Sequence, residues 1–258
     1  MLSLRRVSFR LLLVAALAGA LAACAPRDGH VPDFAKRPFE PFSRSAAVEI
    51  ALREWRLFGG VIAPADAETA SAPAVSLERA QGLWQRVGEY WWLGLDGGQA
   101  GQAYTGLHDE QGRRFAPERD GAYAWSAAFV SYVMRMAGAG RRFPYAAAHA
   151  DYVNAAARGA PGIVLRAEDP AVYAPQAGDL VCVVRAATPA MRYADLPAAR
   201  FWGHCDIVVG HDGMRLDVVG GNVGDAVALR RLALLDDGRL APAERPWLAV
   251  LRVLYDAP

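Results

Sequence analysis

Residues of β character are confined to the last third of the chain, and this one-sided distribution constrains the fold more than any other feature. Helical periodicity comes first, at residues 45–58, 77–93, 125–138 and 145–157. Apolar β-type runs follow at 179–185, 204–211, 214–220, 226–232 and 247–254, and Asp212-Gly213 has the composition of a two-residue hairpin turn. Helices followed by strands predict one α+β domain, with N-terminal helices packed on a mostly antiparallel sheet of about five strands.

The N-terminus is expected to be an export signal. Three arginines among the first ten residues precede an apolar run at 11–21, which is too short to span a bilayer but suits a secretory signal. The small residues before Cys24 resemble a bacterial lipobox, so we expect a signal peptide at 1–23 and a lipid on Cys24. An ordinary signal peptide is the alternative. Ala25 in place of Asp implies, by resemblance to enterobacterial lipoproteins, a periplasm-facing protein of the outer membrane.

Residues 24–44 are rich in proline and charge without periodicity and are expected to be a tether, which leaves 45–258 as a single domain. The chain is 53% hydrophobic and 21% charged, with a formal net charge of +1. Positive and negative side chains alternate along it, as on an ordinary solvated surface. This composition argues against a nucleic-acid partner. No sequence motif indicates a cofactor, and no spacing of histidines, cysteines or carboxylates indicates a metal.

The stretch from Asp120 to Gly138, DGAYAWSAAFVSYVMRMAG, is the first place to look for chemistry. It predicts a loop that leads into a buried helix with Ser126 in its first turn. Backbone N–H groups and the helix dipole favour negative charge there, so the position suits a helix cap and also a nucleophile. His204 begins a later strand and Asn222 ends the next one, which completes the residue types needed for acyl transfer.

The order WSAAFVSYVMRMAG, GDLVCVV, GHCDIVVG and VVGGNVGD resembles the CHAP and NlpC-type papain-fold hydrolases of bacterial cell walls. The whole pattern also resembles a bacterial family known only as a domain of unknown function. The resemblance implies a papain-like domain in which Ser126 takes the place of the nucleophilic cysteine, His204 is the base and Asn222 orients it. Serine must lose its proton during attack, whereas a thiolate is already nucleophilic. The replacement therefore implies either a serine hydrolase or a protein that binds without catalysis.

Two roles remain open between alternative residues: the group that orients the base and the base itself. Pairing across the turn puts Asn222 on the sheet face opposite His204, unless a bulge forms at Gly220-Gly221. Asp206 shares the face of His204 without a bulge and is the rival orienting group, or else a solvated strand residue. His149, on the helix at 145–157, is the rival base or a pocket residue.

Aromatic residues and cysteines complete the set of candidates. Trp91 and Trp92 could wall a binding groove, Trp125 directly precedes the serine, and Asp151 lies two residues after His149, a spacing that does not bring them face to face on a helix. Cys182 and Cys205 each lie in an apolar run. That setting favours two packed thiols over a disulfide, although export would allow a bridge.

Two functions follow from the resemblance and the lipobox. The first is a membrane-anchored lipoprotein that cleaves an amide or peptide bond of peptidoglycan, with Ser126 attacking and His204 as base. The second is a catalytically inactive module that binds peptidoglycan or cell-wall peptides in the same groove. A serine esterase is a third possibility, but the GxSxG nucleophile elbow is absent.

Overall fold

The computed structural model describes residues 42–65, 76–95, 103–185 and 188–255. The predicted signal peptide, Cys24 and nearly all of the predicted tether lie outside the described residues. Within the described ranges, no helix combines the length and apolar character needed to cross a membrane.

Each predicted helix is present, with shifted ends. The expected helix at 77–93 is divided, because a short 3-10 helix precedes α4 and Gly82, at φ 86°, forms the N-cap between them. The last helix begins at His149 rather than at residue 145, so His149 lies in its first turn. The α-helices are α3 (Arg44–Leu57), α4 (Leu83–Gly94), α5 (Ser126–Met136) and α6 (His149–Ala157). Short 3-10 helices span Leu77–Arg79, Pro117–Tyr123, Gly140–Arg142 and Tyr193–Asp195.

The strands form one antiparallel sheet in the order β1-β6-β2-β3-β4-β5. The α+β class is confirmed, but the sheet has six strands instead of about five. The strand that the sequence analysis missed is β1, whose four residues are too short for an alternating pattern to stand out. The strands are β1 (Leu165–Glu168), β2 (Leu180–Val184), β3 (Gly203–His211), β4 (Arg215–Gly220), β5 (Ala228–Ala233) and β6 (Trp247–Val253).

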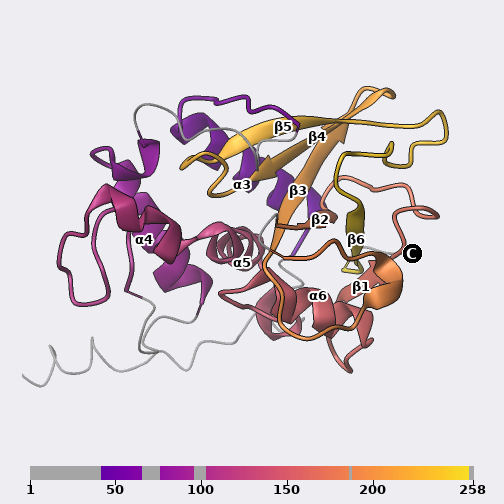
Figure 1. Ribbon diagram of the computed structural model, residues 1–258, viewed down its shortest axis with the longest axis horizontal. Helices are drawn as coiled ribbons and strands as arrows, with labels where there is room; N and C mark the ends of the chain where they lie inside the picture. The colour runs from indigo at the N-terminus through magenta and orange to yellow at the C-terminus, as the bar shows by residue number, and fades with distance from the viewer. Residues whose placement is uncertain (1–41, 66–75, 96–102, 186–187, 256–258) are drawn as a thin grey trace, which may run out of the picture. The chain divides into compact units, whose positions relative to one another are not determined.

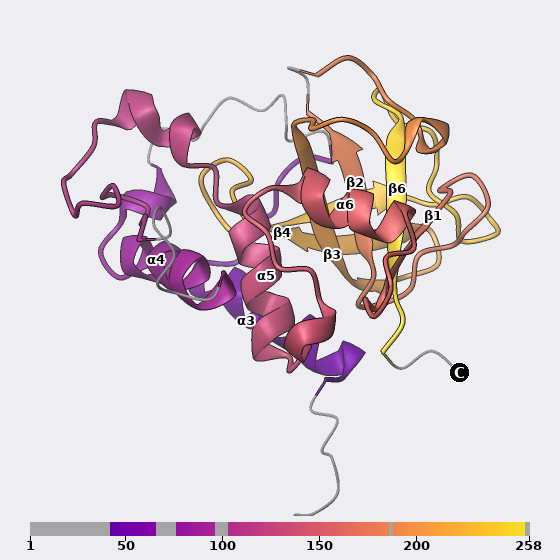
Figure 2. The same cartoon turned by 90° about the horizontal axis from the view of Figure 1, so that it is seen from below.

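Both faces of the sheet are buried. Helices α3, α5 and α6 pack on one face, and α4 packs on α5, which lies between α4 and the sheet (Figure 1). Figure 2 shows α6 beside β1 and β6 at the other end of the sheet. The second face carries a smaller apolar cluster that includes Val181, Val208, Val218 and Leu232. A polar side chain on either face must therefore find partners within the protein.

The β3–β4 hairpin contains a bulge that changes which residues share a face. Ile207 pairs with Val219 and Val208 with Val218, but Gly210 pairs with Asp217, so one extra residue lies in β3. A bulge at Gly220-Gly221 was the condition for Asn222 to face His204; the extra residue lies instead in the neighbouring strand, β3. The turn is also one residue later than predicted, because the N–H of Asp212 donates to the carbonyl of Arg215 (3.1 Å).

Cys182 and Cys205 lie directly opposite each other on β2 and β3 and form a disulfide. The expectation of two packed thiols was wrong. Their Cα atoms are 4.1 Å apart, a closeness that strand register creates and that the composition of each strand does not reveal.

Candidate active site

Ser126 is the first residue of α5, and its side chain does not cap the helix. Trp125 is the N-cap residue and makes no side-chain capping bond. The Oγ of Ser126 lies 2.7 Å from Nε2 of His149, on α6. Ser126 is thus paired with a histidine. It lies at the N-terminus of α5, where backbone N–H groups have no intrahelical acceptors.

His149 is held between two hydroxyl groups. Its Nδ1 is hydrogen-bonded to the hydroxyl of Tyr152, one turn further along α6. Burial, together with the nearby His204 and Arg185, lowers the pKa of His149 well below its ordinary value, so the ring is neutral at neutral pH. A neutral ring has one proton. When that proton is on Nδ1 and is donated to Tyr152, Nε2 is free to accept the proton of Ser126.

His204 is not the partner of Ser126, which corrects the predicted dyad. Its Nε2 lies 2.8 Å from Oδ1 of Asp206, and its Nδ1 lies 3.3 Å from a guanidinium nitrogen of Arg185. A carboxylate only accepts and a guanidinium only donates, so His204 carries its proton on Nε2 and accepts on Nδ1. Both ring nitrogens are therefore engaged by groups other than the serine.

Of the two residues that the sequence offered as partners of His204, Asn222 and Asp206, it is Asp206 that is hydrogen-bonded to His204. It is fully buried and also forms an ion pair with Arg230 of β5. Burial alone would raise its pKa, but Arg230 and His204 hold the pKa of Asp206 well below its ordinary range. Burial lowers the pKa of His204 against the opposing effect of Asp206. The alternative of a solvated Asp206 was wrong, because its side chain is fully buried and bound to His204 and Arg230.

The two hydrogen-bonded groups meet at the histidines. The ring centroids of His149 and His204 are 5.4 Å apart. One group runs from Ser126 through His149 to Tyr152, and the other from His204 through Asp206 to Arg230. Ser126, His149 and His204 are 3%, 4% and 2% exposed, so the cluster is almost closed to solvent.

Gly220 makes room for the second group. It lies on β4, between the strands of Asp206 and Arg230, and a Cβ there would lie 1.8 Å from Oδ1 of Asp206. The same Cβ would lie 3.0 Å from Nε2 of His204. Any other residue would therefore displace the Asp206 carboxylate from the space above β4.

Several other candidates are placed differently from the predictions. Asn222 follows the end of β4 in a left-handed conformation (φ 56°), and no described hydrogen bond joins it to a histidine. Asp151 is exposed on α6. Trp125 is a core residue at 1% exposure, and its indole donates to Glu78.

Trp91 and Trp92 do not form one wall. Trp91 is 6% exposed and packs against the ring of Tyr104 at a centroid distance of 5.3 Å, whereas Trp92 is 49% exposed. Adjacent residues of a helix point in different directions, so the two indoles cannot face one groove.

The sequence analysis missed Tyr152, Arg185 and Arg230. The signal for Tyr152 was its spacing of three residues from His149, which places the two side chains on one helix face. The signal for Arg230 was a charge within an apolar strand, where burial requires a partner. Arg185, at the end of β2, offered no comparable signal.

A group of carboxylates forms a second cluster near the start of α5. Ligand oxygens of Glu78, Asp120 and Asp225 lie within 4.8 Å of one another and could hold a cation. Burial raises the pKa of Glu78 to about 8, against the hydrogen bond from Trp125. Arg79 already forms an ion pair with Asp120, which compensates part of the negative charge.

Comparison with known proteins gives a family but no characterized relative. No curated protein and no solved structure matches the chain. A family model described as an uncharacterized protein conserved in bacteria (DUF2272) matches residues 78–253, which include Ser126, His149, His204 and Arg230. The chain belongs to this bacterial family, DUF2272.

Proposed function

We propose that this protein is a cell-envelope lipoprotein whose domain cleaves amide or peptide bonds of peptidoglycan, with Ser126 as nucleophile and His149 as base. The observation that carries the proposal is the 2.7 Å contact between Ser126 Oγ and His149 Nε2 at the start of a helix. A serine needs a base within hydrogen-bond reach, and a neutral imidazole provides one.

The reaction follows from this geometry. Oγ of Ser126 attacks the carbonyl carbon while its proton passes to Nε2 of His149. The negative oxygen that develops is stabilised by the free N–H groups of the first turn of α5. His149 then gives the proton to the leaving amine as the C–N bond breaks, and water releases the acyl group by the reverse sequence. Tyr152 keeps the proton of His149 on Nδ1 throughout.

The papain-like assignment is part of the proposal. Its support is a nucleophile-position residue at the start of a buried helix that packs on an antiparallel sheet, followed in sequence by the strand that begins with His204. The departure from that pattern is the origin of the base, which comes from α6 instead of from the sheet. In this proposal His204, fixed by Asp206 and Arg185, packs beside His149 and positions its ring.

The envelope location rests on the predicted signal peptide and is supported by the disulfide. Disulfides persist in oxidising compartments such as the bacterial periplasm and are rare in the cytosol. The bridge between Cys182 and Cys205 is consistent with such a compartment.

The proposed function is tested by incubating the purified protein with isolated peptidoglycan and identifying released fragments by mass spectrometry. We expect release by the wild type, none by Ser126→Ala, and a loss of about 10³-fold or more in His149→Ala. The matched comparison is His204→Ala, which removes a buried imidazole but not the proposed base and is expected to retain more activity. A larger loss in His204→Ala than in His149→Ala, with both proteins folded, would refute the assignment of the base.

A second candidate function is binding without catalysis. The observation that favours it is the burial of the site, since Ser126 and His149 are only 3% and 4% exposed. In that case Ser126–His149–Tyr152 is a structural network, and wild type and Ser126→Ala bind peptidoglycan equally in a pull-down while neither releases fragments.

A further inference from the structure

Arg185, directly after β2, is a cation beside the proposed acyl-transfer site. One of its terminal nitrogens lies 3.3 Å from Nδ1 of His204, and the ring centroids of His204 and His149 are 5.4 Å apart. The backbone of Arg185 is fixed at the strand end, because its N–H donates to the carbonyl of Trp202 at 2.8 Å. The guanidinium is therefore held on the histidine side of Ser126.

The positive charge of Arg185 has no carboxylate partner among the residues that the structure describes. Three charged side chains shift the pKa values of the two histidines of the site: Arg185, Asp206 and Arg230. Asp206 and Arg230 form an ion pair, so one positive charge is left over when both histidines are neutral. Arg185 is partly exposed, and a guanidinium has five N–H donors, most of which the contact with His204 leaves for a ligand.

The direction of the proposed reaction indicates which part of a substrate would meet this charge. His149 gives its proton to the leaving amine, so the leaving amino acid lies on the histidine side of Ser126. Arg185 lies on the same side, in contact with His204. In an amino acid the carboxyl carbon is two bonds from the nitrogen. A guanidinium in this place can bind the carboxylate of the leaving residue through charge-assisted hydrogen bonds.

We propose that Arg185 recognises a free C-terminal carboxylate of the substrate, so that the bond cleaved is the last amide bond of a peptide. This inference rests on the proposed function of Ser126 and His149, and it names the substrate class of that site. An interior peptide bond has an amide where the carboxylate would be, and it leaves the charge of Arg185 without its partner.

Binding by the Ser126→Ala protein tests this recognition without catalysis. The probes are Nα,Nε-diacetyl-L-lysyl-D-alanyl-D-alanine, which has one carboxylate, and its C-terminal amide; both are titrated by calorimetry. We expect the acid to bind about tenfold or more tightly than the amide, because only the acid forms charge-assisted hydrogen bonds with the guanidinium. Equal binding of the two probes, or no binding of the acid at millimolar concentration, would overturn the proposal.

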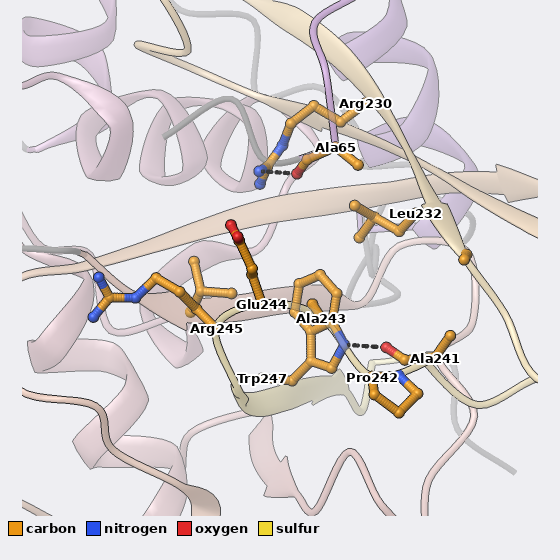
Figure 3. Close-up of a pocket in the computed structure, with 11 residues that line it drawn as sticks. Ala65, Arg230, Leu232, Ala241, Pro242, Ala243, Glu244, Arg245 and Trp247 are labelled. Atoms are coloured by element: carbon orange, nitrogen blue, oxygen red, sulfur yellow. Dashed lines mark hydrogen bonds between the residues drawn. The ribbon is translucent and has the colours of Figure 1, made fainter. Parts of the chain in front are cut away.

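Two further substitutions, each added to that protein, locate the carboxylate. Arg185→Gln keeps an N–H donor for His204 but removes the charge, and it is expected to reduce the affinity for the acid to that for the amide. Arg245→Gln is the matched control. Arg245 lines a cavity on the second face of the sheet and donates to the carbonyl of Thr188 at 3.1 Å, and its guanidinium extends away from Arg230 (Figure 3). A preference for the acid that persists in folded Arg185→Gln, or that disappears in Arg245→Gln, would contradict the assignment.

The wild-type protein separates this inference from the proposed function. We expect it to release the terminal alanine from the acid, and to cleave the amide with a kcat/KM lower by about tenfold or more. Selective binding of the acid without any release by the wild type would refute the hydrolase and support the recognition by Arg185. Cleavage of both probes at equal rates would support the hydrolase and overturn the recognition.

Discussion

The proposed roles of Ser126 and His149 depend on the contact between their side chains. The sequence places Ser126 at the start of a helix. In the structure its hydroxyl makes no capping hydrogen bond and instead lies 2.7 Å from Nε2 of His149. His204 attracted attention because it begins a strand after a glycine, a place typical of a base in the resembling families. Its own partners, Asp206 and Arg185, leave neither ring nitrogen for the serine. The sequence could identify the chemical groups but not their pairing, because pairing depends on how α6 lies against β3.

The pH dependence of the proposed activity tests the role of His149. Burial and its cationic neighbours lower the pKa of His149 well below 6.5, and only the neutral ring can accept the serine proton. Activity should therefore be retained as the pH falls through 6.5 and should decline only at lower pH. The measurement is the pH profile of kcat/KM on solubilised peptidoglycan fragments. An acidic limb centred at or above pH 6.5 would show that a different group is the base.

At the scale of elements, glycines let strands and helices pack closely where a larger residue would not fit. A bulge at Gly220-Gly221 was the condition for Asn222 to share the face of His204, but the two glycines instead allow close packing. Gly220 leaves space for Asp206, while a Cβ at Gly221 would lie 2.5 Å from Cβ of Phe129 on α5. Strand and helix positions could be predicted from apolar periodicity. The bulge could not, since its position within β3 is decided by pairing with β4.

Gly220→Ala tests the space above β4. Its Cβ would lie 1.8 Å from Asp206 Oδ1, so the Asp206–Arg230 ion pair must move, at a cost of about 2–4 kcal/mol in the free energy of unfolding. The control is Gly210→Ala, also in the β3–β4 hairpin, where a Cβ meets nothing within 4 Å. We expect that variant to change stability by less than about 1 kcal/mol. Urea denaturation measures both, and equal stabilities of the two variants would contradict the packing described.

Glu78 links the 3-10 helix Leu77–Arg79 to α5 through its hydrogen bond from Trp125. Because burial raises its pKa from 4.5 to about 8, the folded protein binds this proton more tightly than the unfolded chain. Its contribution to stability is complete below pH 4.5 and is lost as the pH rises toward 8. Glu78→Gln keeps an acceptor for the indole without a charge.

We therefore expect Glu78→Gln to match the wild type near pH 4 and to exceed it near pH 8 by on the order of 5 kcal/mol, since one pKa unit corresponds to about 1.4 kcal/mol. Thermal or urea unfolding at the two pH values provides the comparison. A variant that is destabilised equally at both would mean that the carboxylate is not strained by burial.

For the whole molecule, the sequence order of helices and strands was sufficient to predict an α+β domain. What it could not supply was long-range register: the opposition of Cys182 and Cys205, the sixth strand, and the buried line of side chains from His204 to Arg230. Each of these depends on contacts between residues distant in sequence. The apolar pattern of a single segment does not show which distant segment it will contact.

Reduction of the disulfide tests the packing of the whole sheet. The bridged residues are 23 apart in sequence, and closing a loop of this size restricts the unfolded chain by about 3 kcal/mol in the chain-entropy description. We expect dithiothreitol to lower the free energy of unfolding by this amount, and no effect of dithiothreitol on a folded Cys182→Ala, Cys205→Ala double variant. Unchanged wild-type stability with both thiols demonstrably free would contradict this description.

The most direct test of the central claim is covalent labelling of Ser126 by a fluorophosphonate. In that reaction the serine oxygen bonds to phosphorus, fluoride leaves, and the hydroxyl proton passes to the base, so no natural substrate is needed. The account predicts modification at Ser126, found by peptide mass spectrometry, that is lost in Ser126→Ala, slowed by about 10³-fold in His149→Ala, and much less affected in His204→Ala. Absence of labelling in the folded wild type, or labelling that persists in His149→Ala but vanishes in His204→Ala, would contradict it.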